Sequence, residues 1–505
     1  MNETAAKLSI GEKLGYSLGD TAANFIFQTM LVFQSIFYTD TFGITPGEVA
    51  ALLLVVRVWD AVFDPLMGAL ADRTRTRWGK FRPWILWTAV PFGIMGFLTF
   101  TTPHFSHAGK LAYAYVTYIV LMMVYSANNL PYSALSGVMT GDIGERTSLS
   151  SYRFVFAMLA AFVVQGLAMP MVEHFGHGDN ALGYQVTMGI FSTLCIIFFF
   201  ITFLSTRERI LPDPRQKSSL KQDFADLFHN GPWLTLFALT IFVFITLSMR
   251  GGDMLYYFKY YIDKDRLFAV LQSCGLAAAA GDPSGGTGLW HGFLHAFGLV
   301  TAPDKKNLVS VGFSLFNICG LGSTIIGIFF SKPLAMRFGK RNVFIGGLFA
   351  TTVFTAVFVF LPPDAIKLAF GTEMLRQFSY GPTIPLLWAM MADVADYAEW
   401  KTGRRATGII FSAIVFGLKA GLGIGGAIGT KLLSVYGYVP NAEQSADALR
   451  GIRLTASIFP AIPFFIGVIC LFFYKIDKTL NIQISDELAE RRKQYAPQTP
   501  LPEAP

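Results

Sequence analysis

The amino-acid sequence predicts an all-α membrane protein with about twelve transmembrane helices in two six-helix halves. Three observations lead to this prediction: long apolar runs, few charged residues, and basic residues gathered in alternate loops. Of the 505 residues, 53% are hydrophobic and only 14% are charged, whereas a soluble globular chain carries roughly 25% charged residues. Runs such as 186–204 and 456–474 have about the twenty residues that a spanning helix needs.

The apolar runs form two groups of six expected spans, separated by a polar segment. We expect spans near 15–39, 47–71, 83–102, 111–136, 150–172 and 185–204, and then near 233–262, 307–331, 342–361, 367–395, 407–436 and 452–474. The chain therefore divides into an N-terminal bundle (1–204), a cytoplasmic linker (205–232), a C-terminal bundle (233–475) and a tail (476–505). The second bundle contains a long Gly-, Ala- and Ser-rich insert, 263–306, in which a short helix is expected near 289–299.

Sequence similarity between the halves is weak, and the loop charges predict their orientation. Arg-Trp-Gly-Lys follows the second span at 77–80, and Arg-Phe-Gly-Lys follows the eighth at 337–340. Lys and Arg gather in the even-numbered connections, whereas the short loops 38–48 and 173–180 contain neither. Because positive charge stays on the cytoplasmic side, we expect both termini in the cytoplasm. This distribution accounts for the net charge of +7 without a nucleic-acid partner.

Two carboxylates in the second span are candidates for binding a cation. Asp60 and Asp64 lie four residues apart, so they share one helix face. Each charged side chain inside an apolar helix costs about 2.5–3.5 kcal/mol, and such residues are usually functional. Oxygen ligands also suit a hard cation. The alternative is a salt bridge between Asp60 and Arg57 on the same helix.

Polar residues in the first and fourth spans are candidates for contacting a solute. Asp20 and Asn24 lie one turn apart, and Asn128 and Asn129 precede Pro131. Such side chains can hydrogen-bond sugar hydroxyls, although Asn commonly also joins membrane helices. Aromatic residues near these positions could stack on sugar rings, although most aromatics in such a chain serve packing or the membrane interface. They are Tyr16, Phe25, Tyr132, Tyr256, Tyr257, Tyr380 and Trp388.

Several cationic residues fall within or beside apolar runs. Arg153 opens the fifth span and Lys419 lies inside the eleventh, where an intramembrane Lys is a functional candidate. Lys419 has an equal alternative, an ion pair with one of the aspartates. For the remaining cations we expect local pairs, Arg250 with Asp253 and Arg376 with Glu373.

The sequence indicates neither a resident metal nor an enzyme. Three histidine pairs occur: His104 with His107, His174 with His177, and His291 with His295. All six fall in loops or in the insert, and no Cys or acidic residue completes a ligand set. Motifs for phosphate binding, for a nucleophilic serine and for a metalloprotease are missing from the sequence. We therefore expect no cofactor other than a coupling ion, Na⁺ or H⁺.

These residues resemble a known transporter family. Gly-Ala-Leu-Ala-Asp-Arg at 68–73, followed by Gly-Lys at 79–80, is similar to the motif between the second and third helices of the major facilitator superfamily. The flanking segments 57–65 and 77–84 resemble the glycoside–pentoside–hexuronide:cation symporters, which include the melibiose carrier. Asn-Leu-Pro-Tyr at 129–132 and Ala-Asp-Val-Ala-Asp-Tyr at 392–397 extend the resemblance to most of the chain.

The resemblance implies a multi-pass bacterial inner-membrane transporter that imports a sugar with a cation by alternating access. The family's cation carboxylates match Asp60 and Asp64, and its fourth-helix aspartate, shared by sugar and cation, aligns with Asn129. Its first-helix sugar-binding aspartate aligns with Asn24, and Asp20 one turn earlier could substitute.

Further family positions are matched or altered. The fifth-helix arginine matches Arg153 and the eleventh-helix lysine matches Lys419, whereas Ser133 replaces the sugar-stacking tryptophan. The cation half of the site is thus kept in part and the sugar half is altered. We assign the solute set to Asp20, Asn24, Asn128, Asn129, Tyr132, Arg153, Trp388 and Lys419, and the cation set to Asp60, Asp64 and Asn129.

A charged layer at the cytoplasmic ends of the helices is predicted to form ion pairs that close that side in the outward-facing state. It comprises Asp72, Arg73, Asp142, Glu145 and Arg146 in the first half, and Asp393, Asp396, Glu399, Arg404 and Arg405 in the second.

The expected activity is cation-coupled import of a glycoside by a monomer surrounded by lipid. Two carboxylates of the melibiose-type site are replaced by Asn24 and Asn129, while Arg153 and Lys419 remain, so a more positive cavity and an acidic solute, a hexuronide or oligouronide, are predicted. Asp20 opposes this prediction. The alternatives are a passive or lipid-type carrier on the same fold and a sensor that transports nothing.

Overall fold

The computed structural model describes residues 7–140, 143–209, 228, 230–277, 294, 299–301, 304–402 and 407–495. Every named element within these residues is helical, which agrees with the predicted fold class. The first half comprises α1 (Ile10–Ile36) with its π-helical extension η2 (Phe37–Phe42), α2 (Pro46–Arg73), α3 (Arg82–Thr99), α4 (His107–Met139), α5 (Ile143–Gly176) and α6 (Asn180–Ser205).

The second half repeats this order with more interruptions. Its long helices are α8 (Gly231–Tyr256) with the π-helix η3 (Tyr257–Tyr261), α11 (Leu308–Phe329), α13 (Lys340–Val357) with the short turn η4 (Phe358–Phe360), α14 (Ile366–Tyr380), α15 (Thr383–Thr402), α16 (Thr407–Val435) and α18 (Ile458–Phe472). Shorter or peripheral helices are α9 (Lys264–Ser273), α12 (Ser331–Phe338), α17 (Ala446–Thr455) and α19 (Lys478–Tyr495).

Local sequence signals explain where the first helices begin. Ser9 and Glu12 form a capping box at α1, and Thr45 and Glu48 form another at α2, where Pro46 occupies the first helical position. Between them Gly43 adopts a φ of 85°, which a residue with a side chain seldom adopts, and this turns the chain back into the bundle. The two helices are therefore delimited by short-range chemistry that can be read from the sequence.

Eight helical stretches in the described residues are long and apolar enough to cross a membrane. They comprise α4, α5, α6, α8 with η3, α11, α13 with η4, α16, and α17 with α18. The remaining predicted spans, α1, α2, α3 and the α14–α15 pair, pack among these eight in the same bundle.

Two predicted spans are each broken into two helices. The span expected at 367–395 is α14 and α15, separated at Gly381–Pro382, and it runs on to Thr402. Pro382 lacks an N–H group, and a Cβ on Gly381 would lie only 2.5 Å from the carbonyl oxygen of Thr324 on α11. The break thus lets α11 approach closely.

The span expected at 452–474 is α17 and α18, with the break at Ala456–Ser457. In the insert 263–306 the structure shows α9, and most of the helix expected near 289–299 lies outside the described residues.

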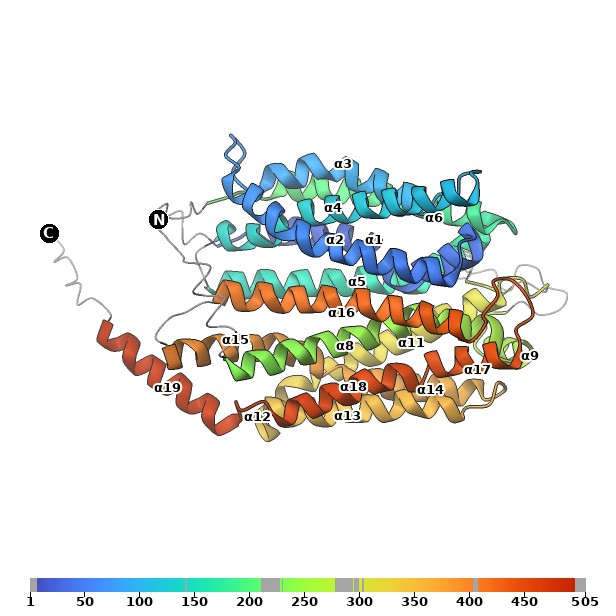
Figure 1. Ribbon diagram of the computed structural model, residues 1–505. Coiled ribbons are helices and arrows are strands. Elements are labelled where there is room, and N and C mark those ends of the chain that lie inside the picture. Colours follow the sequence, from blue (N-terminus) through green and yellow to red (C-terminus); the bar gives the residue numbers. More distant parts are fainter. Residues whose placement is uncertain are drawn as a thin grey trace.

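Figure 1 shows the two halves as layers, with α1–α6 above and α8–α18 below, and with helices running along the same axis. We call the end where α1 begins and α19 follows the inner end, after its predicted cytoplasmic side. The opposite end, which carries η2 and η3, is the outer end. Between the halves, α2 packs on α16, α5 on α11, and α1 on α8.

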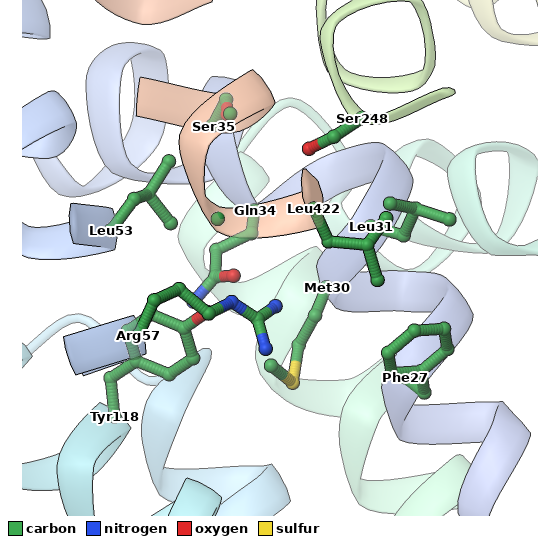
Figure 2. A pocket seen from close by; sticks show the side chains of 12 residues that line it. Phe27, Met30, Leu31, Gln34, Ser35, Leu53, Arg57, Tyr118, Ser248 and Leu422 are labelled. Atoms are coloured by element: carbon green, nitrogen blue, oxygen red, sulfur yellow. The ribbon is translucent and has the colours of Figure 1, made fainter. Parts of the chain in front are cut away.

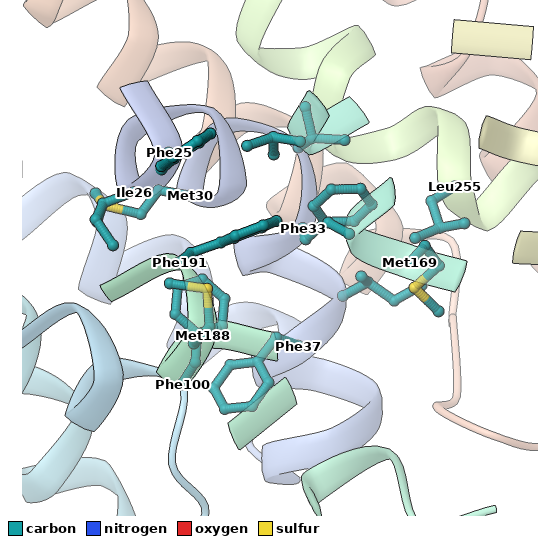
Figure 3. Packing of buried hydrophobic residues seen from close by; sticks show 14 of the residues in the cluster. Phe25, Ile26, Met30, Phe33, Phe37, Phe100, Met169, Met188, Phe191 and Leu255 are labelled. Atoms are coloured by element: carbon teal, nitrogen blue, oxygen red, sulfur yellow. The ribbon is translucent and has the colours of Figure 1, made fainter. Parts of the chain in front are cut away.

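The largest apolar core lies mainly in the first half and crosses to the second near the outer end. Its aromatic centre includes Phe25, Phe33 and Phe191, with Leu255 of α8 close by (Figure 3). Phe33 meets Phe313 of α11 with ring centroids 6.2 Å apart. Apolar burial therefore holds the halves together at the outer end.

Candidate cation and solute site

The two candidate carboxylates of α2 face α16 across the interface between the halves. Lys419 Nζ lies 2.5 Å from Asp64 Oδ2 and 3.4 Å from Asp60 Oδ2. Asp60 is 2% exposed, and its Oδ1 accepts a hydrogen bond of 2.9 Å from Ser126 Oγ on α4. Asp60 and Asp64 are thus brought together as predicted, and an ammonium group lies beside both.

Close packing of α2 against α16 sets this geometry. Gly423 lies one turn beyond Lys419, and a Cβ there would lie 2.0 Å from Arg57 Cγ. Only a residue without a side chain leaves room for Arg57, whose Nη1 is 3.8 Å from Asp60 Oδ2. The alternative salt bridge, Asp60 with Arg57, therefore forms alongside the carboxylate pair rather than instead of it.

A small cavity of about 30 Å³ lies next to this cluster, lined by residues of α1, α2, α4, α8 and α16. Figure 2 shows the guanidinium of Arg57 pointing into it toward Met30, with Gln34 and Tyr118 beside it. Among the described residues, Arg57 Nε and Nη1 and Gln34 Nε2 are buried without a hydrogen-bond partner. The space is sufficient for one water molecule, whose oxygen can accept hydrogen bonds from two of these donors.

Asp20 and Arg153 form a further charged contact, which lies within the first half. Arg153 donates from Nε to Asp20 Oδ2 at 2.5 Å and from Nη2 to Oδ1 at 3.2 Å. Its guanidinium lies 4.9 Å from the centroid of the Tyr132 ring. Asp20 and Arg153 thus lie together as predicted, but each balances the charge of the other.

Tyr132 supports this pair from within the helix packing. Its ring stacks on Tyr16 at 4.6 Å between centroids, and each hydroxyl donates to the other residue's carbonyl oxygen. A Cβ at Gly19 would lie 2.5 Å from the Tyr132 ring. Tyr132 is fully buried, so in this conformation it presents no surface to a solute and instead positions Arg153.

The predicted asparagines have different surroundings. Asn24 Nδ2 donates to the carbonyl oxygen of Asp20, one turn earlier on α1. Asn128 is buried and donates from Nδ2 to Thr88 on α3 at 2.8 Å, which favours the alternative that it joins helices. Asn129 Nδ2 lies 3.5 Å from the hydroxyl of Tyr125, on the same helix as Ser126. No direct contact between Asn129 and Asp60 or Asp64 is seen in the described part of the chain.

Trp388 lies on α15 and is 43% exposed, and the described residues make no ring or hydrogen-bond contact with it. The structure does not place it beside Asp20, Arg153 or Lys419.

Two polar residues that the sequence analysis did not single out continue the hydrogen-bonded chain that starts at Asn24. Gln28 Nε2 donates to Asn24 Oδ1 at 3.4 Å, and Gln165 Nε2 on α5 donates to Gln28 Oε1 at 3.5 Å. Asp20, Asn24 and Gln28 recur every four residues, so they form one polar stripe on α1. This spacing is the signal that would have included Gln28 from sequence.

The predicted charged layer at the inner end is described only in part. Asp142, Arg404 and Arg405 lie outside the described residues, and for Asp72, Arg73 and Arg146 only the backbone is described. Asp393 is 2.7 Å from Lys340 Nζ, in the same half. Glu145 is 2.9 Å from Lys13 Nζ, also within one half. These two pairs therefore stay inside their own halves.

At the outer end, by contrast, an ion pair joins the halves. Asp40 in η2 accepts from Lys259 Nζ of η3 at 2.6 Å and from the hydroxyls of Tyr260 and Tyr438 at 2.8 and 2.6 Å. Asn441 donates to the backbone oxygen of Asp40 at 2.6 Å. The outer end is thus closed by polar contacts as well as by the apolar core.

The second half holds a buried cluster whose pairing differs from the prediction. Arg376 pairs with Glu373 as expected, with Nη2 2.6 Å from Oε1. Arg250, however, pairs with Glu373 at 2.7 Å and not with Asp253. The break between α17 and α18 explains this change, because it exposes the carbonyl oxygen of Ala456 as a second acceptor for Arg250.

The arrangement resembles that of known transporters in sequence and in fold. The chain matches the family described as MFS/sugar transport protein over residues 15–313 and 310–478. It is 34% identical to the putative glycoside/cation symporter YagG of Escherichia coli over 487 residues, 96% of each chain. It is 32% identical to an isoprimeverose transporter of Lactiplantibacillus pentosus, covering 94% of this chain and 90% of that protein.

A glucuronide carrier protein homologue of Escherichia coli is 28% identical and covers 95% of each chain. In fold, the chain is similar to an inward-facing bacterial homologue of the lysosomal transporter Spinster, with a TM-score of 0.61, 13% identity, and coverage of 92% of this chain and 97% of that one. The helical bundle, the intramembrane charges and these similarities agree: the chain is a multi-pass transporter of the bacterial inner membrane, not an enzyme, and it belongs to the glycoside–cation symporter branch of the major facilitator superfamily.

Proposed function

We propose that this protein imports an acidic glycoside, a hexuronide or oligouronide, by symport with Na⁺ or H⁺, and that its inner end faces the cytoplasm. One observation carries the coupling part: the ammonium of Lys419 on α16 lies against Asp60 and Asp64 on α2. Because these helices belong to different halves, anything that displaces the ammonium also changes the contact between the halves.

The charge balance suggests how a coupling ion acts there. Asp60, Asp64, Arg57 and Lys419 sum to zero formal charge, so an added cation makes the cluster positive unless Lys419 withdraws. A cation bound between the carboxylates therefore competes with Lys419, and its binding weakens the α2–α16 contact. Carboxylate oxygens suit Na⁺ as ligands, and a carboxylate that accepts a proton loses its attraction for Lys419 in the same way.

The polar stripe of α1 supports the solute part of the proposal. Asp20 can accept hydrogen bonds from sugar hydroxyls, and Arg153 can donate to them or to a carboxylate. A solute carboxylate would compete with Asp20 for the planar guanidinium of Arg153. The relative that is a glucuronide carrier homologue supports an acidic solute, whereas the isoprimeverose transporter shows that neutral sugars also occur among the relatives.

Gradient-driven uptake in proteoliposomes tests the coupling. We expect accumulation of solute against its gradient when an inward Na⁺ or H⁺ gradient is imposed, and loss of that accumulation in Asp64→Asn, which should still exchange solute across the membrane. Asp265→Asn, the same chemical change at a side chain that is 86% exposed on α9, is the matched control and should behave like the parent. An Asp64→Asn variant that still concentrates solute would show that the carboxylates are structural.

The same preparation separates the alternatives. A passive carrier would exchange solute in counterflow but ignore both ion gradients, and a sensor would show no counterflow.

The acidic class is tested by competition: uronides should inhibit uptake more strongly than their neutral parent sugars. Equal inhibition would overturn the acidic solute while leaving the symport proposal intact.

A further inference from the structure

A cavity of about 150 Å³ lies where α1 and α5 of the first half meet α8, α11 and α14 of the second. Its polar lining includes Gln165, Arg250, Asn317, Glu373, Arg376 and Gln377. None of these residues belongs to the cation set or to the solute set predicted from sequence. The cavity is lined by both halves, as a transporter site must be if it is to open to either side in turn.

The cavity carries a net positive charge inside the bundle. Arg250, Arg376 and Glu373 are each 5% exposed in their side chains, and two cations face one carboxylate, which leaves a formal charge of +1. By comparison, the pair formed by Asp20 and Arg153 has a formal charge of zero. The cluster of Asp60, Asp64, Arg57 and Lys419 also has a formal charge of zero. The predicted excess of positive charge around Arg153 and Lys419 is therefore balanced by Asp20, Asp60 and Asp64, and among the described residues an excess lies instead at Arg250 and Arg376.

The cavity also presents hydrogen-bond donors that lack acceptors. Arg376 uses Nε and Nη2 on Glu373, which leaves Nη1 without a hydrogen bond among the described residues. Asn317 Nδ2 is buried without a partner in the same part of the chain. Gln377 Oε1 already accepts from Thr324, so its amide nitrogen is the group left to donate. A donor-rich, positive cavity favours an anionic group with several acceptor oxygens.

A polar path connects this cavity with the candidate solute site of the first half. Asn24, Gln28 and Gln165 are linked by hydrogen bonds of 3.4 and 3.5 Å, and Gln165 lines the cavity itself. From Asp20 to Gln28 the stripe climbs about 12 Å along α1, at about 1.5 Å per residue. A solute longer than one sugar ring could therefore contact both places at once.

We infer that this cavity binds the carboxylate or sulfonate of the transported glycoside, with Arg376 as the main donor and Asn317 and Gln377 as further donors. The inference rests on the proposed function and assigns its acidic specificity to the second half. Arg250 is a positioning residue here: it is anchored on Ala456 and Glu373 and lies over the Phe358 ring at 4.3 Å, so it holds Glu373 and thereby orients Arg376.

The competing explanation is that the cluster only braces α8, α14 and α17. A brace explains the Arg250 contacts, but it explains neither the cavity nor the unpartnered donors of Arg376 and Asn317. The two explanations also differ in their consequences. A brace affects all solutes alike, whereas an anion site affects acidic solutes selectively.

Binding to the purified full-length protein tests the inference without relying on ion coupling. The probes are 4-nitrophenyl β-D-glucuronide and 4-nitrophenyl β-D-glucoside, which differ in the carboxylate, and their affinities are measured by calorimetry. We expect the glucuronide to bind the parent protein roughly tenfold more tightly, equivalent to about 1.4 kcal/mol. Arg376→Gln should abolish that preference, because it should weaken glucuronide binding much more than glucoside binding.

Two further variants separate the site from the fold. Arg341→Gln makes the same chemical change where Arg341 holds backbone carbonyls of Leu471 and Phe472 outside the cavity, and it should keep the preference. Asn317→Asp adds a negative charge to the cavity without touching the ion cluster, and should selectively weaken glucuronide binding. This variant keeps the test decisive if Arg376→Gln does not fold.

Three results would overturn the inference: a parent protein without preference for the glucuronide, a preference that survives both cavity variants, or equal loss of both probes in them. None of these results bears on whether uptake depends on an ion gradient. The anion site can therefore be disproved while symport is confirmed, and symport can be disproved while the anion site is confirmed.

Discussion

The two buried ion clusters of this bundle differ in which parts of the molecule they join. Asp60 and Asp64 on α2 meet Lys419 on α16, across the interface of the halves. Glu373 and Arg376 on α14 meet Arg250 on α8, within the second half. Alternating access moves one half against the other, so the first cluster must rearrange in each cycle while the second can persist. Ion pairs between the halves are therefore expected to break and re-form during transport, whereas ion pairs within one half can remain intact.

The clusters also differ in charge. The first is neutral when Arg57 is counted, so the proposed binding of a cation there requires the release of Lys419. The second keeps a formal charge of +1 beside a cavity, which attracts an anion. Two variants, Glu373→Gln and Lys419→Gln, test this contrast, and Asp40→Asn and Asp265→Asn then test contacts that lie outside the two clusters.

Glu373→Gln should cause the largest loss of stability. It removes the carboxylate between two buried guanidinium groups and leaves both uncompensated, and breaking a buried ion pair in this way costs about 3–5 kcal/mol. The free energy of unfolding in detergent, measured by denaturant titration, should fall by that amount. Asp64→Asn should cost less, because Asp60 remains beside both Lys419 and Arg57 and still balances one of the two cations. Equal losses in the two variants would remove the proposed distinction.

Lys419→Gln should strengthen binding of the coupling cation, because it removes the ammonium that competes for Asp60 and Asp64. We expect the cation concentration for half-maximal stimulation of solute binding to fall by about tenfold, or ~1.4 kcal/mol, while gradient-driven uptake declines. Lys305→Gln, at a half-exposed pair on the insert, is the control. A weaker apparent cation affinity in Lys419→Gln would contradict competition.

Asp40→Asn should loosen the contact that closes the outer end. It weakens the contact with Lys259 and two tyrosine hydroxyls, each charge-assisted hydrogen bond being worth roughly 1.5–3 kcal/mol. We expect faster alkylation of a cysteine reporter introduced near the outer end, since the outer-open state becomes more populated. Unchanged alkylation would indicate that apolar packing alone closes this end.

Asp265→Asn should have no measurable effect on uptake or unfolding. A hydrogen bond from Lys305 lowers the pKa of Asp265, but the pair is solvent-exposed, where ion pairs contribute little. Thermal unfolding at neutral pH should match the parent protein. A clear loss would mean that the insert is coupled to the bundle.

Most of the fold follows from the sequence because the responsible signals are short in range. Helix starts are specified by capping residues such as Ser9 and Thr45, and spans by apolar length. The shared face of Asp60 and Asp64 follows from the helical period alone. The two helix breaks that the sequence analysis missed depend instead on contacts between distant helices. At Gly381 the break allows α11 to pack closely, and at Ala456 the backbone carbonyl accepts a hydrogen bond from Arg250.

Sequence alone therefore determined the helical bundle, its two halves, and the faces on which Asp20, Asp60 and Asp64 lie, because all of these depend on neighbours within a few turns. Only the tertiary structure decided the partners of the charged residues. Arg250 pairs with Glu373 although Asp253 is closer to it in the sequence, and Lys419 pairs with Asp64 of the other half. A buried charge must be paired with a group that helix packing brings close to it. The pairs formed here join residues more than a hundred positions apart in the sequence. They also leave the excess positive charge beside the cavity of the second half.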